Sequence, residues 1–225
     1  MKPQIEKREA DHLLGPFEAR VLPRMARALP SKVLPDHLTL LALISAIGIG
    51  LSYGFSSRSP LFLWLASIGL VLHWFGDSLD GTLARVRKTE RPRYGFYLDH
   101  ITDAFSTLFI GLGLGFSPYL HLSIALVFLI VYYLLFINVF LETHVLGIFR
   151  MGYGRIGTTE IRLLMILCNT VLAIGLPFQF RILGVGLGPL DIFGLVLALG
   201  MGVIFLGRMV GDLRTLSRLD PLKKK

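Results

Sequence analysis

The sequence predicts an all-α polytopic membrane protein with six transmembrane helices and an N-terminal amphipathic interfacial helix. Composition is the first reason: 53% of the residues are hydrophobic, 17% are charged, and the mean hydropathy is +0.65. A soluble domain of 225 residues rarely has such values, whereas a chain that exposes apolar helices to lipid does. The other two reasons are a series of apolar stretches and the distribution of basic residues between them.

The chain divides into one membrane domain and two flanking segments. Residues 1–34 combine charges with apolar positions at helical spacing, which predicts a helix on the membrane surface, and a solvated tail is the alternative. Gly15-Pro16 prevents one continuous helix there. Residues 35–215 are expected to form the six-helix domain, and residues 216–225 a basic C-terminal tail.

Six apolar stretches are each long enough to cross about 30 Å of hydrocarbon at about 1.5 Å per residue. We expect them near 36–55, 60–80, 95–116, 119–143, 160–178 and 189–208. Small residues in two of them predict close helix packing. These are Gly111, Gly113 and Gly115 in the third stretch, and Gly200, Gly202 and Gly207 in the sixth.

Basic residues alternate from one end of these stretches to the other. Of the 23 Lys and Arg residues, all but Arg58 and Arg181 belong to the N-terminal segment, the 81–94 and 144–162 connections and the C-terminal part. The positive-inside rule therefore predicts that both termini lie in the cytoplasm. This topology accounts for the net charge of +8. The sequence has no basic stripe with interleaved aromatic residues, so we expect no nucleic-acid partner.

Four aspartates, Asp77, Asp80, Asp99 and Asp103, lie where apolar stretches meet the 81–94 connection. On helices, the first two are three residues apart and the last two are four apart, so each pair shares a face. Carboxylates beside a bilayer indicate function by default. Mg²⁺ or Mn²⁺, which prefer oxygen ligands, would relieve their repulsion. The alternative is a salt-bridged helical hairpin, because basic residues are close by: Arg85, Arg87, Lys88, Arg91 and Arg93.

Further polar residues gather at the same predicted level of the membrane. His100 precedes Asp103 by three residues and could accept a proton near neutral pH, although a structural hydrogen bond is the alternative. Arg155 and Arg162 could bind phosphate through their guanidinium groups, or could anchor the helix among lipid headgroups. Glu142 and His144 lie at the end of the fourth stretch, and Glu160 lies at the start of the fifth.

The order D-x-x-D-G-x-x-A-R followed by G-x-x-x-D-x-x-x-D resembles the signature of the CDP-alcohol phosphotransferase family. The matching residues are Asp77, Asp80, Gly81, Ala84, Arg85, Gly95, Asp99 and Asp103. This resemblance implies an enzyme that cleaves a CDP-linked alcohol, releases CMP and transfers the substituted phosphate to an acceptor alcohol during phospholipid synthesis. It implies two Mg²⁺ or Mn²⁺ ions held by the four aspartates.

The resemblance also implies roles for individual residues. Nucleotide binding falls to Asp77, Gly81, Ala84, Arg85 and Gly95, where the glycines let backbone approach the ligand. Asp103 or His100 would be the catalytic base. Binding of the acceptor or headgroup is assigned to Glu142, His144, Arg155, Glu160 and Arg162. Family members are commonly homodimers, and we expect the same here.

Within the family the sequence is most similar to the choline/ethanolamine phosphotransferase branch, through Asp99-His100, Glu142-Thr143-His144 and Thr159-Glu160-Ile161. That similarity favours transfer from a CDP-ethanolamine- or CDP-choline-like donor to diacylglycerol. The alternative is a CDP-diacylglycerol-dependent transfer to a soluble alcohol or alcohol phosphate. A cation-coupled transporter is a distant alternative, since it predicts acids distributed through the spans, whereas the four aspartates cluster at one end of them. The active site is expected to face the cytoplasm.

Overall fold

A computed structural model describes residues 4–5, 13–149, 157–175, 180–182 and 185–222. The elements follow the chain as β1 (Gln4–Ile5), α1 (Gly15–Ala28), α2 (Pro35–Phe55), α3 (Leu61–Arg87), α4 (Pro92–Gly115), α5 (Leu122–Leu146), β2 (Ile148–Phe149), α6 (Thr158–Ala173), β3 (Phe180–Ile182), β4 (Val185–Leu187) and α7 (Pro189–Leu219). Parallel β1 and β2 and antiparallel β3 and β4 form two short strand pairs that the sequence analysis did not predict.

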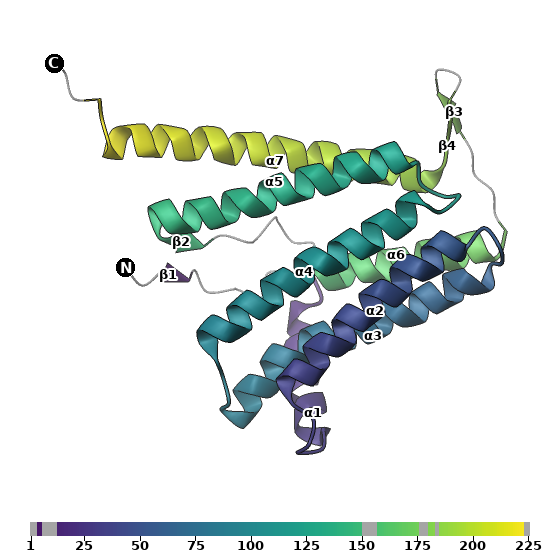
Figure 1. The fold of residues 1–225 in the computed structure, drawn as a ribbon, viewed down its shortest axis with the longest axis horizontal. Coiled ribbons are helices and arrows are strands. Elements are labelled where there is room, and N and C mark those ends of the chain that lie inside the picture. The colour runs from purple at the N-terminus through teal and green to yellow at the C-terminus, as the bar shows by residue number, and fades with distance from the viewer. Residues whose placement is uncertain (1–3, 6–12, 150–156, 176–179, 183–184, 223–225) are drawn as a thin grey trace.

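The long helices lie side by side in the order α6, α3, α2, α4, α5, α7, and α1 packs against α3 (Figure 1). Helices α2, α3 and α4 are the centre of this row. One apolar cluster joins α1 to α2 and α3 through Leu22, Leu38, Leu79 and Leu83. A second cluster joins α2 to α3 at their other ends, around Ile49, Tyr53 and Leu70.

Each predicted span corresponds to a helix, but several helices extend beyond the predicted bounds. Helix α3 continues to Arg87, well past residue 80, because no proline or glycine interrupts the segment between Gly81 and its C-cap. Lys88 ends it in the left-handed conformation, with φ of 56°. Pro92 then starts α4, so the connection between the aspartate pairs is far shorter than the expected 81–94 loop.

Helices α2, α3, α5 and α7 are long and apolar enough to cross a membrane. Helix α6 has 16 residues, and α4 carries Asp99 and Asp103, so neither is identified as a span by length and composition. Large apolar side chains such as Leu199 and Val203 are exposed on α7, as expected for a surface that contacts lipid. The chain is an all-α polytopic membrane protein. Helix α7 also runs through the expected boundary at residue 215 and ends at Leu219.

Glycine allows α2 and α4 to cross closely. A Cβ atom added to Gly113 would lie 2.3 Å from the carbonyl oxygen of Gly50, and one added to Gly50 would lie 2.4 Å from the oxygen of Phe109. The prediction of close packing is thus confirmed for the third span. On α7 the structure shows no such close approach within this chain, since an added Cβ at Gly200 or Gly207 has no neighbour within 4 Å among the described residues.

Buried polar side chains fix the ends of several helices. Asp191 accepts hydrogen bonds from the backbone N–H groups of Gly188 and His121 at 2.8 Å each, which joins the start of α7 to the start of α5. Asn169 donates to Ser67 at 3.1 Å and accepts from the Tyr53 hydroxyl at 3.0 Å, which links α6 to α3 and α2. Interhelical hydrogen bonds of this kind stabilise helix packing in lipid.

Candidate active site

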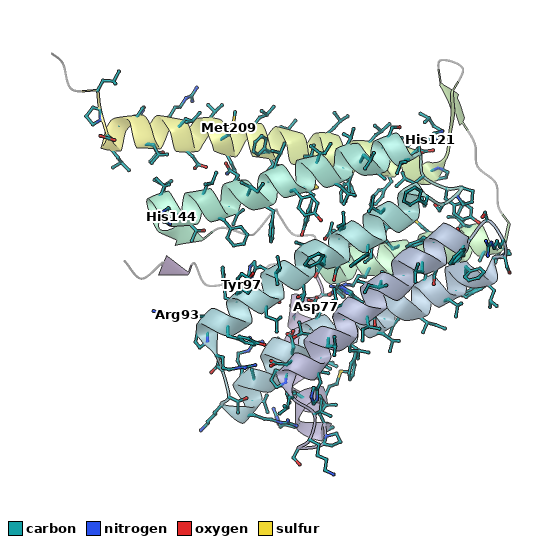
Figure 2. All side chains as sticks on the ribbon, in the orientation of Figure 1. Asp77, Arg93, Tyr97, His121, His144 and Met209 are labelled. Atoms are coloured by element: carbon teal, nitrogen blue, oxygen red, sulfur yellow. The ribbon has the colours of Figure 1, made fainter. Side chains whose placement is uncertain are left out.

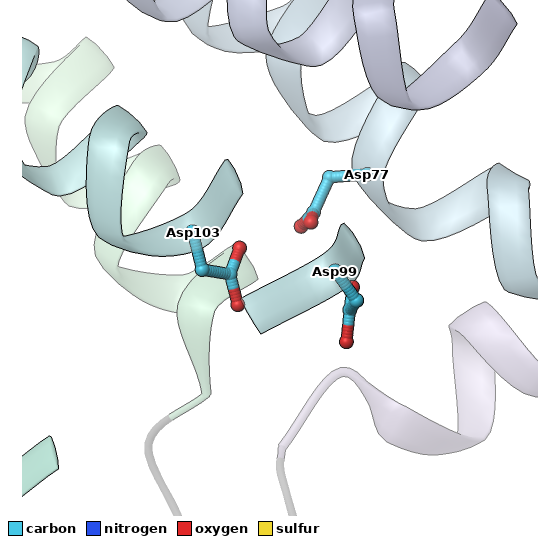
Figure 3. A group of neighbouring side chains, drawn as sticks. All are labelled: Asp77, Asp99 and Asp103. Carbon is cyan, nitrogen blue, oxygen red and sulfur yellow. The ribbon is translucent and has the colours of Figure 1, made fainter. Parts of the chain in front are cut away.

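Three aspartates from two helices converge at the centre of the row. Asp77 belongs to α3, and Asp99 and Asp103 are on adjacent turns of α4; each offers a carboxylate oxygen, and these oxygens lie within 4.8 Å of one another. Figure 3 shows the three side chains close together, with the carboxylates of Asp77 and Asp103 facing the gap between α3 and α4 and that of Asp99 beside them. All three side chains are half-buried. Because oxygen ligands in such proximity suit a divalent cation of the magnesium type, the residues present fit a metal centre.

Asp80 lies beside this group but not in it. Its Oδ2 atom accepts a hydrogen bond of 2.7 Å from the Thr39 hydroxyl of α2, and its Oδ1 atom accepts one from the backbone N–H of Gly81. Asp77 and Asp99 are still near enough to act electrostatically on it. The sequence spacing gave no sign that a residue of α2 would orient this carboxylate.

Arg162 of α6 donates a hydrogen bond of 2.5 Å from Nη2 to Asp77 Oδ2, so it forms an ion pair with a carboxylate of the three-aspartate group. The sequence analysis placed Arg162 near the site but did not predict this partner. Helix α6 is thereby attached to α3 at the level of the site. A second attachment is made by Glu18 of α1, which accepts hydrogen bonds from Trp74 Nε1 and the Thr159 hydroxyl.

The nucleotide-binding candidates follow the acids along α3 and α4. Arg85 donates a hydrogen bond of 3.0 Å to the Thr82 hydroxyl, and its Nη1 atom would be 3.4 Å from a Cβ added to Gly81. The guanidinium therefore lies over Gly81. Ala84 is half-buried on the same helix. A Cβ added to Gly95 has no described neighbour within 4 Å, which leaves space beside the α4 backbone for a ligand.

His100 is buried, and its ring packs among phenylalanines. The ring centroid is 4.2 Å from that of Phe96 and 5.6 Å from that of Phe140 on α5. Its Nδ1 atom is 2.7 Å from the carbonyl oxygen of Phe96 and 3.6 Å from Asp99 Oδ2. Contacts with α4 and α5 thus fix the orientation of this imidazole, while Asp103 belongs to the three-aspartate group.

The acceptor candidates lie in different places. Glu142 is buried on α5, where its Oε2 atom is 4.0 Å from Arg208 Nη1 of α7. These two residues, with Asp212, line a cavity of about 360 Å³ between the two helices. His144 is exposed near the end of α5 (Figure 2).

Glu160 accepts hydrogen bonds from the backbone N–H groups of Leu14 and Gly157, at 2.8 and 2.9 Å, and so caps α6 while holding the start of α1. Among the described acceptor candidates, Arg162 contacts an aspartate of the site. Arg155 lies outside the described residues.

The connection beside the site is attached to the start of α2. Arg91 forms an ion pair with Asp36, and its guanidinium carbon is 3.9 Å from the centroid of the Tyr94 ring. The hydrogen bond to the Asp36 carboxylate raises the pKa of the Arg91 guanidinium. Arg87, the last residue of α3, donates to backbone carbonyls of the segment between α1 and α2, including those of Leu29 and Pro30 at 3.0 and 2.8 Å.

A polytopic helical bundle with a carboxylate cluster that could hold divalent cations is consistent with a membrane enzyme that acts on phosphorylated substrates. The family model described as CDP-alcohol phosphatidyltransferase matches residues 32–204, which include α2 to α6 and all four aspartates. The chain belongs to this family. It is therefore a transferase of phospholipid synthesis that uses CDP-alcohols.

Proposed function

We propose that the chain transfers the substituted phosphate of a CDP-ethanolamine- or CDP-choline-like donor to diacylglycerol and releases CMP. The observation that carries this proposal is the convergence of Asp77, Asp99 and Asp103 from α3 and α4. The acceptor hydroxyl oxygen attacks the phosphorus that bears the headgroup alcohol. A new P–O bond forms, the P–O bond to the CMP oxygen breaks with its electron pair, and the hydroxyl proton passes to a base.

The proposed metal ligands are Asp77, Asp80, Asp99 and Asp103, which would hold two Mg²⁺ or Mn²⁺ ions. When bound, such ions neutralise the diphosphate charge and stabilise the attacking and leaving oxygens. Arg85 would pair with a phosphate oxygen of the donor, since it is exposed above Gly81. Gly81, Ala84 and Gly95 would leave room for the nucleotide.

Asp103 is the base that we favour. Asp103 is one of the three aspartates that converge at the site, whereas the His100 ring is packed against Phe96 and Phe140. Glu142, His144, Arg155, Glu160 and Arg162 remain the proposed acceptor or headgroup residues. We further propose six spans, a homodimer, and cytoplasmic placement of the active site and both termini, following the distribution of basic residues.

A second version is favoured by the position of Arg162 beside Asp77. A guanidinium at the site suits an anionic acceptor, as in the transfer of a phosphatidyl group from CDP-diacylglycerol to an alcohol phosphate. Release of CMP by the purified protein with a panel of donor and acceptor pairs distinguishes the two versions. Release with CDP-ethanolamine or CDP-choline and diacylglycerol supports the first, and release that requires CDP-diacylglycerol excludes it.

Metal dependence is tested in the same assay. Chelation with EDTA should abolish CMP release, and added Mg²⁺ or Mn²⁺ should restore it, because without the ions the attacking and leaving oxygens lose the charge that would stabilise them. The variant Asp99→Asn should remain inactive after the metal is restored. Activity that persists in EDTA would contradict the proposed metal site.

A further inference from the structure

The contact between Arg162 and Asp77 joins a permanent positive charge to a proposed metal ligand. The 2.5 Å bond is formed between largely buried side chains, which are 12% and 21% exposed. An arginine–carboxylate bond in such surroundings is among the stronger hydrogen bonds in proteins. A divalent cation that uses the same Asp77 oxygen has to displace the guanidinium, and the two positive charges repel each other.

Three buried nitrogen atoms beside this contact have no hydrogen-bond partner among the described residues: His73 Nδ1, His73 Nε2 and Arg162 Nη1. His73 is one turn before Asp77 on α3 and is 5% exposed. Arg162 and Asp77 are both near enough to act electrostatically on its ring. Buried polar groups are normally paired, so these unpaired nitrogen atoms call for an explanation. A second arrangement in which they gain partners would supply one. A neutral imidazole has one acceptor nitrogen, and an arginine N–H suits it.

We propose that Arg162 is an exchangeable counterion of the metal site. It neutralises Asp77 when no metal is bound, and it moves to the acceptor nitrogen of His73 when a divalent cation takes the carboxylate. The exchange keeps α6 attached to α3 in both states and leaves no buried carboxylate without a counterion. This inference rests on the proposed function, because it assumes that Asp77 is a metal ligand.

The test is direct binding of Mn²⁺ to the purified full-length chain in detergent micelles, measured by electron paramagnetic resonance of the free ion. Arg162→Gln removes the competitor and should tighten Mn²⁺ binding about tenfold, as expected for loss of a hydrogen bond to a charged group. His73→Phe keeps a ring of similar size but removes the alternative acceptor, so it should weaken binding severalfold. The double variant should behave like Arg162→Gln alone, because no guanidinium remains to be displaced.

Arg208→Gln is the matched control. Arg208 also has a carboxylate neighbour, Glu142 at 4.0 Å, but this pair lies between α5 and α7. The variant should therefore leave Mn²⁺ affinity unchanged. Arg162→Lys, which keeps the charge but loses the guanidinium, should give an intermediate affinity. Circular dichroism of each variant checks that it folds. Should Arg162→Gln not fold, Arg162→Lys and His73→Phe carry the test.

Unchanged or weaker Mn²⁺ binding by folded Arg162→Gln would overturn the competition. An effect of His73→Phe that persists in the double variant would overturn the exchange, since it would not depend on the arginine. A wild-type chain that binds no Mn²⁺ would instead contradict the proposed metal site. The two failures are therefore distinguishable.

Discussion

The Thr39 hydroxyl of α2 donates a hydrogen bond of 2.7 Å to Asp80 Oδ2 of α3. This bond orients one of the four aspartates from a neighbouring helix. A hydroxyl that holds a metal-ligand carboxylate commonly matters for metal affinity almost as much as the ligand itself. Thr39 thus connects the packing of α2 on α3 to the chemistry of the site.

Replacement of Thr39 by valine, which has nearly the same shape, should lower metal-dependent CMP release. We expect a loss of about 10- to 100-fold, expressed partly as a higher metal concentration for half-maximal rate, because the Asp80 carboxylate loses its fixed direction. Thr39→Ser should restore most of the activity. Thr170→Val, which removes a hydroxyl bonded to the Ile166 carbonyl in α6, is the control and should stay active. Equal activity of Thr39→Val and wild type would show that Asp80 needs no support from α2.

Asp103→Asn and His100→Phe separate the two candidate bases. Loss of a positioned base typically costs about 10²–10⁴-fold in rate, and we expect this loss for Asp103→Asn. His100→Phe keeps an aromatic ring between Phe96 and Phe140 and should retain most of the turnover. The measurement is CMP release at saturating metal and substrate. A collapse of turnover in both His100→Phe and His100→Ala, with Asp103→Asn still active, would assign the base to the histidine.

The family was predictable because the D-x-x-D-G-x-x-A-R and G-x-x-x-D-x-x-x-D motifs resemble its signature. The grouping of acids on helices α3 and α4 was predictable because i,i+3 and i,i+4 spacing determines which side chains share a helix face. Periodicity within one helix cannot say which other helix packs against that face. The bond from Thr39 to Asp80 and the ion pair from Arg162 to Asp77 both cross between helices, so neither could be predicted from periodicity.

The length of α3 was predicted wrongly for a different physical reason. Hydropathy falls after residue 80, and a drop in hydropathy marks the end of an apolar stretch rather than the end of a helix. Good helix formers continue to Arg87, and the stop comes from Lys88 and Pro92. Asp77 and Asp80 consequently lie two to three turns inside a continuous helix, where their positions are rigid.

Arg87 should contribute more to stability than the exposed Arg91. Its guanidinium donates to the backbone carbonyls of Leu29, Pro30 and Val33. These carbonyls lie in the segment between α1 and α2, so without Arg87 they would lose this hydrogen-bond donor. Arg87→Lys should lower the free energy of unfolding by about 1–3 kcal/mol and increase hydrogen exchange in residues 29–33. Unfolding in mixed micelles measures the first effect, and mass spectrometry the second.

Arg91→Lys is the control for Arg87→Lys. Its ion pair with Asp36 is solvent-exposed, and such pairs contribute little to stability, so the free energy of unfolding of this variant should change little. A larger loss for Arg91→Lys than for Arg87→Lys would show that the connection at 88–91, and not the segment at 29–33, is the contact that matters.

Gly113 is the position where one added methyl group should damage the fold and the site together. A Cβ there would lie 2.3 Å from the carbonyl oxygen of Gly50, so α4 must move away from α2. Gly113→Ala should lower the free energy of unfolding by about 1–3 kcal/mol, as overpacking does. Because α4 also carries Asp99 and Asp103, the variant should bind Mn²⁺ more weakly although the substitution is far from the carboxylates along the helix.

Gly200→Ala is the matched control on α7, where an added Cβ meets nothing described within 4 Å. Its helix should gain stability slightly or stay the same, since alanine is the better helix former. Thermal unfolding and Mn²⁺ binding of both variants in the same detergent give the comparison. If Gly113→Ala were as stable as wild type, α2 and α4 would not need their close crossing, and another contact would have to hold α4 at the distance that brings its two aspartates to Asp77.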